Sequence, residues 1–327
     1  MTSVASSATP NAAEGKRRFL WLDCARGIAL IAMASYHFLW DLADFGYLEH
    51  NYPSTGWPRL YARAIATTFL FLSGFSLYLA HRDGIRWRPF GKRLAMIAGA
   101  AVMVTIGTWF AIPHGFIFFG ILHAIAAMSV IGLAFLRLPW FINLAIAALV
   151  IALPNLYRDA MFDQPWLWWV GLSTKMRLSF DYVPIFPWFG LFLIGIASAP
   201  LFLRLSGMRQ IASRKTPYSL VAGAFSYLGR HSLVFYLIHQ PILISMLYLY
   251  SLAAPPGPVE PEAAYIESCE TNCQRSRGEA FCRTFCACTL DRLQRRDLLA
   301  PLQSGTISSD DSERMTAIAI ECTGANP

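Results

Sequence analysis

The sequence predicts an all-α polytopic membrane bundle of about seven transmembrane helices, followed by a small Cys-rich α-helical C-terminal module. Hydrophobic residues make up 55% of the 327 residues and charged residues only 14%, whereas an ordinary soluble domain carries about 25% charged residues. The hydrophobic residues form long runs, and the cysteines gather near the end of the chain. The apolar composition and the long hydrophobic runs indicate a membrane protein, and the clustered cysteines indicate a separate module.

The N-terminal segment 1–18 is small and polar and lacks the apolar core of a signal peptide, so we expect a cytoplasmic tail. Its last three residues are basic and precede the first apolar run, as in a signal anchor. The transmembrane domain is expected at 19–252, with spans at about 19–40, 61–81, 93–112, 117–136, 140–154, 183–203 and 229–252.

The basic residues predict the orientation. With a cytoplasmic N-terminus, thirteen of them fall on the inner side and five on the outer side, in agreement with the positive-inside rule. The outer group is Arg59, Arg63, Arg158, Lys175 and Arg177. An odd number of spans places the C-terminus outside. Because orientation explains the net charge of +7, the expected partner is the lipid bilayer, and no nucleic acid is expected.

The stretch 22–47 combines an apolar run with a polar stripe. At 100° per residue, one helix face carries Asp23, Arg26, His37, Asp41 and Asp44. Arg26 and His37 are almost three turns apart, or about 16 Å along the axis. A charge at membrane depth costs a few kcal/mol unless it faces protein or water, so the stripe predicts an interior site.

Arg26 and His37 are the main candidates on this stripe. Arg26 suits a phosphate-bearing ligand, although it is alternatively an anchor that snorkels to the headgroups. His37 has Asp41 at i+4, where a carboxylate can fix the imidazole tautomer and raise its basicity. The alternative is a helix-end histidine bonded to a backbone carbonyl. His50, in the first outer loop, is a second candidate for the chemistry.

Other polar groups are candidates for the bundle interior. His123 and His239, in the fourth and seventh spans, are either pocket residues or hydrogen-bond partners between helices. Arg230, in LGRHSL, is a second candidate phosphate contact, and Asp181 tops the sixth span. In FLFLSGFSLYLA, the small residues around Gly74 predict close helix packing.

A Pro-rich linker is expected at 253–264 and the Cys-rich module at 265–327. The module holds Cys269, Cys273, Cys282, Cys286, Cys288 and Cys322. The first two pairs are each spaced i, i+4, so on two short helices each pair shares a face. An antiparallel hairpin would join Cys269 to Cys286 and Cys273 to Cys282, which leaves Cys288 for Cys322. A zinc site is the alternative, and an oxidising exterior favours disulfides.

Five motifs carry a resemblance to a known family. They are, in order, LDCARGIALIAMASYHFLWDL, FLFLSGFSLYLA, FGILHAIA, DYVPIFPWFG and YLGRHSLVFYLIHQP. They resemble bacterial membrane proteins related to the catalytic domain of heparan-α-glucosaminide N-acetyltransferase, in a wider group of transmembrane acyltransferases. The resemblance spans about residues 18–252.

The resemblance implies acyl transfer from cytoplasmic acetyl-CoA to an amine or hydroxyl acceptor, such as a sugar, at the extracytoplasmic side. Arg26 matches the family's first-span arginine. The catalytic histidine of eukaryotic members lies in the first outer loop, where His50 is the only histidine, whereas His37 falls where they have an asparagine. The catalytic assignment therefore lies between His37 and His50. We expect the protein to lie in the bacterial inner membrane and to need no metal, and whether it forms a homo-oligomer is left open by the sequence.

Two other functions are consistent with these residues. A proton-coupled small-molecule transporter also keeps His, Asp and Arg inside a bundle, although it typically shows internal repeats, and the sequence has none. A non-catalytic membrane scaffold that displays the Cys-rich module is the other. Acetyl-CoA binding would distinguish the enzyme from both.

Overall fold

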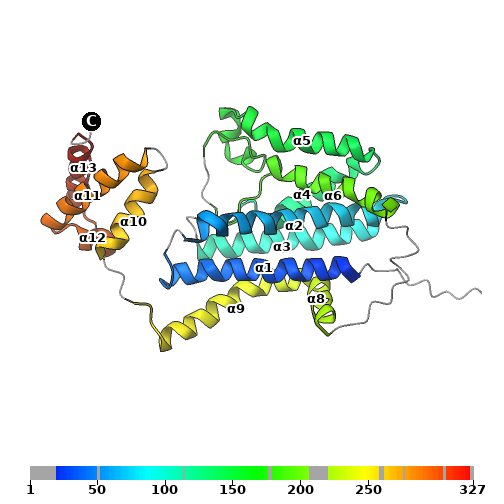
Figure 1. The fold of residues 1–327 in the computed structure, drawn as a ribbon, viewed down its shortest axis with the longest axis horizontal. Coiled ribbons are helices and arrows are strands. Elements are labelled where there is room, and N and C mark those ends of the chain that lie inside the picture. Colours follow the sequence, from blue (N-terminus) through cyan, green and yellow to red (C-terminus); the bar gives the residue numbers. More distant parts are fainter. Residues whose placement is uncertain are drawn as a thin grey trace, which may run out of the picture. The chain divides into compact units, whose positions relative to one another are not determined.

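The computed structural model describes residues 20–49, 52–112, 115–175, 179–205, 220–257, 261–274, 277–304 and 307–324. Within these ranges the regular structure is helical, without strands (Figure 1), which confirms the predicted fold class. The chain forms two compact units. One comprises Met1–Phe38 and Gly56–Ile244, and the other comprises Leu39–Thr55 and Ser245–Pro327.

The long apolar runs form the helices. In chain order these are α1 (Leu20–Asp44), α2 (Gly56–His81), α3 (Trp87–Ala111), α4 (Ile121–Gly132), α5 (Trp140–Leu156), α6 (Ile185–Leu205), α8 (Leu220–Arg230) and α9 (Ser232–Ala253). Four of the described helices, α2, α3, α6 and α9, are long and apolar enough to cross a membrane, and α4 and α5 are shorter apolar helices. The predicted seventh span, 229–252, covers the end of α8 and nearly all of α9. The structure divides it into two helices, which are separated at His231.

Glycines let α2 and α6 pack at backbone contact. A Cβ at Gly74 would lie 2.0 Å from the carbonyl oxygen of Phe192, and a Cβ at Gly195 would lie 2.2 Å from that of Phe71. The core beside this contact includes Phe192, Leu193 and Ile196, each 0% exposed. The close packing that the sequence predicts around Gly74 is confirmed, because small residues allow two helix backbones to approach.

Glycines also allow α1 and α8 to pack with their backbones in contact. A Cβ at Gly27 would lie 2.1 Å from the carbonyl oxygen of Phe225, and one at Gly229 would lie 1.9 Å from that of Asp23. This contact brings Arg230, the last residue of α8, next to the first turn of α1. Two segments about two hundred residues apart in the sequence therefore share a site.

The loop between α5 and α6 is held by Asp163. Its carboxylate accepts hydrogen bonds from the Ser173 hydroxyl (2.6 Å) and from the Thr174 hydroxyl (2.7 Å) and backbone N–H (2.9 Å). These bonds lower the pKa of Asp163 to about 2, because they stabilise the charged form. The Trp168 indole donates to the Asp163 carbonyl at 2.8 Å. This loop, which includes Trp166, Trp168 and Trp169, thus has its own hydrogen-bonded structure.

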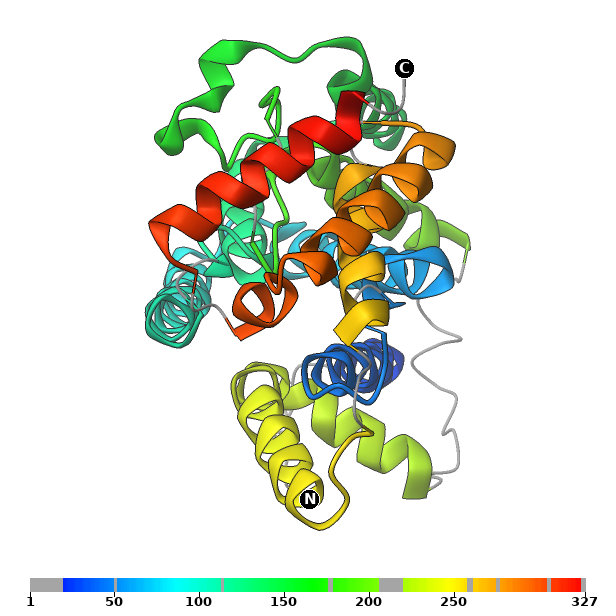
Figure 2. The ribbon, with the colours of Figure 1, turned by 90° about the vertical axis from the view of Figure 1, so that its left-hand side faces the viewer.

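The second unit contains the Cys-rich helices α10 (Pro261–Cys273), α11 (Glu279–Arg295), α12 (Leu299–Ser304) and α13 (Ser309–Gly324). Figures 1 and 2 show α10, α11 and α13 gathered in one small group. Of the linker expected at 253–264, residues 258–260 lie outside the described ranges, and α10 already begins at Pro261.

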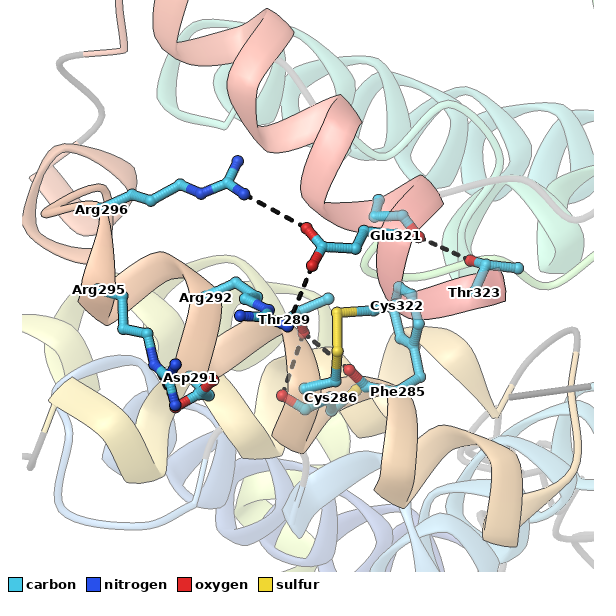
Figure 3. Close-up of a disulfide and its surroundings, with 12 residues drawn as sticks. Phe285, Cys286, Thr289, Asp291, Arg292, Arg295, Arg296, Glu321, Cys322 and Thr323 are labelled. Carbon is cyan, nitrogen blue, oxygen red and sulfur yellow. Dashed lines mark hydrogen bonds and ion pairs between the residues drawn. A yellow bond between two sulfur atoms is a disulfide. The ribbon is translucent and has the colours of Figure 1, made fainter. Parts of the chain in front are cut away.

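Three disulfides join the helices of this group. They pair Cys269 with Cys286, Cys273 with Cys282, and Cys288 with Cys322, which is the connectivity that the i, i+4 spacing favours. Figure 3 shows Cys322 of α13 in its disulfide, beside Glu321. The Glu321 carboxylate pairs with Arg292 at 3.0 Å and with Arg296 at 3.3 Å. These bonds tie α13 to α11 and to the turn that follows it.

Candidate functional site

The first polar site is a group of charges around Asp23, which we call the arginine cluster. One carboxylate oxygen of Asp23 lies 3.3 Å from Nη1 of Arg26, and the other lies 3.6 Å from Nε of Arg230. The Arg26 Nη2 donates to the Ser76 hydroxyl at 2.5 Å, and the Arg230 Nη2 donates to Ser226 at 3.1 Å. The structure thus brings together the two arginines that the sequence singles out as phosphate contacts.

Arg93 of α3 belongs to the same cluster. It lies close enough to Arg26 for the two positive charges to interact. The cluster then combines three guanidinium groups with one carboxylate, that of Asp23, so this site has an excess of positive charge. Such an excess suits a ligand with several phosphate charges, because guanidinium groups bind phosphate oxygens through paired N–H donors.

The second polar site is a pair of imidazole rings. The ring centroids of His37 on α1 and His239 on α9 lie 5.1 Å apart, with the rings tilted by 58°. His239 is 7% exposed, and its Nδ1 lies 2.7 Å from the carbonyl oxygen of Tyr236. We call His37 and His239 the histidine pair. The sequence suggests a role for each residue, but the structure places them together.

A third polar group joins α4, α9 and the start of the DYVPIFPW segment. The Asp181 carboxylate accepts a hydrogen bond from the Ile121 N–H at 2.8 Å and another from the Tyr236 hydroxyl. Burial raises the pKa of Asp181 to about 6, although these two bonds partly offset the effect. Tyr236 therefore links Asp181 through its side chain to the histidine pair through its carbonyl.

His123 has a partner at each ring nitrogen. Its Nδ1 accepts from the Gly120 N–H at 3.2 Å, so the ring proton lies on Nε2, 3.1 Å from the Thr105 hydroxyl oxygen. The Thr105 hydroxyl in turn donates to the Ile117 carbonyl at 2.7 Å. This bonding corresponds to the helix-to-helix alternative for His123, and its role as a pocket residue stays a prediction.

The structure does not place two of the predicted catalytic residues, His50 and Asp41, beside the histidine pair. His50 lies outside the described residues. Asp41 is 3% exposed and belongs to the second unit, so its pairing with His37 stays a prediction. Among the described residues, Cys24 is the free cysteine; it is partly buried, with its Sγ 3.4 Å from the Ala222 carbonyl oxygen. It packs at the contact between α1 and α8.

Three residues of these sites escape the sequence argument. Ser76 lies in the FLFLSGFSLYLA motif, but there the small residues indicate only packing. Arg93 appears among the inner basic residues as a topological charge. Tyr236 precedes His239 by three positions, and this i, i+3 spacing is the signal that could have linked them.

The described fold and these sites define a helical membrane protein with charged and imidazole groups inside its bundle. Residues 18–241 match the family model described as heparan-alpha-glucosaminide N-acetyltransferase, catalytic. Because this match covers more than half of the 327 residues, the chain belongs to that family of membrane acetyltransferases, whose donor is acetyl-CoA. Neither a curated protein nor a solved structure gives a significant match to the chain.

Proposed function

We propose that the protein transfers an acetyl or other acyl group from cytoplasmic acyl-CoA to an amine or hydroxyl acceptor, such as a sugar, at the extracytoplasmic side of the membrane. The observation that carries this proposal is the arrangement of two sites along α1. The arginine cluster lies at Arg26 and the histidine pair lies at His37, about 16 Å farther along the helix. The family match supports the same reaction class.

The two sites suit the two ends of the donor. CoA carries its phosphates at one end and its thioester at the other, joined by the extended pantetheine arm. Arg26 and Arg230, with Arg93, would hold the phosphates. A donor lying along α1 would then bring the thioester toward His37. There the imidazole would deprotonate the acceptor or carry the acyl group itself. The i+4 spacing makes Asp41 one candidate for the group that orients it.

The sidedness of the reaction rests on the distribution of basic residues. The arginine cluster lies at the end of α1 that follows Lys16, Arg17 and Arg18, and basic residues mark the cytoplasmic side. Acyl-CoA is a cytoplasmic metabolite, so its phosphates would meet the cluster there. His37 would lie in the outer half, within reach of an extracytoplasmic acceptor.

The test is acetyl-CoA binding and CoA release by the purified full-length protein. Wild type should bind acetyl-CoA and release CoA, with glucosamine or water as the acceptor. His37→Ala should lower release about 100-fold or more and leave binding largely intact, whereas Arg26→Ala should weaken binding. Full activity in His37→Ala would move the catalytic assignment to His50. Absence of acetyl-CoA binding in wild type would contradict the enzyme and favour a transporter or a scaffold.

A further inference from the structure

The Nε2 atom of His239 is buried, and none of the interactions described above involves it. Because a backbone carbonyl can only accept a hydrogen bond, the contact of Nδ1 with the Tyr236 carbonyl oxygen at 2.7 Å places the ring proton on Nδ1. The neutral ring then carries its lone pair on Nε2. This Nε2 is buried and has no hydrogen-bond partner within the described part of the chain. A buried acceptor of this kind calls for a donor.

The ring that carries this lone pair is held on several sides. Phe235 stacks on it, with ring centroids 6.0 Å apart and planes 6° apart. Tyr236 holds Nδ1 through its carbonyl, and its own hydroxyl is bonded to Asp181. The position of Nε2 is therefore set by the packing of α9 against Asp181.

His37 is the neighbour that can supply the donor. The other rings beside His239 belong to Phe235 and Tyr236. Phe235 has no polar atom, and the Tyr236 hydroxyl is already bonded to Asp181. The imidazole of His37, 5.1 Å away between centroids, carries a ring N–H. No hydrogen bond joins the two described rings, but such bonds are often long without substrate and tighten in the reactive complex.

We propose that His239 positions His37 for the acyl transfer proposed above, by accepting the His37 ring N–H at its Nε2. This bond fixes the tautomer of His37 and leaves the lone pair of its other nitrogen free for the acceptor. His239 thus performs, from α9, the task that the sequence assigns to Asp41.

The reaction balances with these groups. His37 takes the proton of the acceptor hydroxyl or amine, and the freed electron pair of that oxygen or nitrogen forms a bond to the thioester carbonyl carbon. The C–S bond breaks, and its electron pair leaves on sulfur. The sulfur takes the proton from His37, which gives the CoA thiol. Throughout, Nε2 of His239 stabilises the positive charge on His37 through the shared N–H.

The experiment compares two variants of His239 that separate its two nitrogens. In His239→Asn the amide N–H replaces Nδ1–H toward the Tyr236 carbonyl, but no acceptor remains at the position of Nε2. In His239→Gln the longer side chain can place its carbonyl oxygen near that position. The matched control is His231→Asn, because Nδ1 of His231 contacts the Tyr227 carbonyl oxygen at 3.0 Å on an exposed ring.

We would measure kcat and KM for CoA release from acetyl-CoA by the full-length protein, with glucosamine and with water. His239→Asn should lower kcat at least tenfold with an unchanged KM for acetyl-CoA. His239→Gln should recover most of that loss, and His231→Asn should stay within about twofold of wild type. Because His239 acts through His37, adding His239→Asn to His37→Ala should cause no further loss.

The outcomes separate this inference from the proposed function. If His37→Ala releases CoA far more slowly than wild type, but His239→Asn matches wild type, His239 does not position His37. A double variant that loses the product of the two single effects would also overturn the inference, because it would show an independent structural role. If Asp41→Asn alone removes the activity, Asp41 orients His37. A wild type that releases no CoA would overturn the proposed function and this inference together.

Discussion

A side-chain carbon at position 229 would lie 1.9 Å from the carbonyl oxygen of Asp23, so Gly229 and Asp23 hold α8 and α1 at backbone contact. Asp23 also forms ion pairs with Arg26 and Arg230. The arginine cluster therefore depends on a glycine that carries no charge itself.

Gly229→Ala should disrupt the arginine cluster. The added methyl group must push α8 away from α1, because its closest neighbour is backbone, and overpacking of this kind typically costs about 1–3 kcal/mol. We expect acetyl-CoA to bind at least tenfold more weakly in equilibrium binding with labelled donor. Gly223→Ala is the matched control, because a Cβ there on the same helix meets no atom within 4 Å. Equal binding by the two variants would contradict the predicted role of this contact.

Ser76→Ala should weaken donor binding by removing one of the two side chains that bond to Arg26, since Asp23 is the other. Hydrogen bonds to charged groups contribute about 1.5–3 kcal/mol, so the Kd for acetyl-CoA should rise about tenfold. Ser129→Ala is the control, since both serines are 8% exposed and both donate to the carbonyl four residues earlier. Only Ser76 also receives a bond from Arg26. If the two variants behave alike, the bond to Arg26 does not support donor binding.

Asp181 should make stability depend on pH. Its pKa is raised to about 6 in the fold, against about 3.9 in an unfolded chain, so the folded state holds this proton more tightly. The free energy of unfolding should therefore be highest below about pH 4, fall by about 3 kcal/mol as the pH rises to 6, and then level off.

Denaturant unfolding in detergent between pH 4 and pH 7 would measure this dependence. Asp181→Asn should flatten it, because an amide does not ionise. Asp83→Asn should leave it unchanged, since the Asp83 side chain is 88% exposed. A slope that persists in Asp181→Asn would assign the pH dependence to another group.

The Cys288–Cys322 disulfide should stabilise the C-terminal module most through its long loop. It joins residues 34 apart, for which loop closure predicts about 3–4 kcal/mol. Cys288→Ser should therefore lower the unfolding midpoint of the module, whereas Cys24→Ser, which removes a free thiol, should leave it nearly unchanged. Mass mapping of the unreduced protein should recover the three pairs. Six free thiols in the module, or stoichiometric zinc, would contradict them.

The topology predicts that the module lies outside the cytoplasm. A reporter that is active only in the cytoplasm, fused after the last residue, should be silent, because seven spans from a cytoplasmic N-terminus end outside. The same reporter fused within 206–219, between the sixth and seventh spans, should be active. A strong signal from the C-terminal fusion would remove the seven-span topology.

Much of the fold could be predicted from the sequence because its signals are local. Long apolar runs mark the helices, since a membrane leaves few alternatives for backbone hydrogen bonds. The i, i+4 spacing of Cys269 and Cys273 places both thiols on one helix face, and that periodicity suffices to suggest their partners. Arg26 and His37 stand out for a similar reason, because charge inside an apolar run is costly.

The partners of Arg26 and His37 were decided only by the tertiary structure. Arg93 and Ser76 meet Arg26, and His239 meets His37, from helices that lie far away in the sequence. Which polar groups meet depends on how helices pack, and packing depends on where backbones can approach, as at Gly229 and Asp23. The sequence by itself thus determined which residues need an interior partner, whereas helix packing selected the partner, because contact between distant segments has no period along the chain.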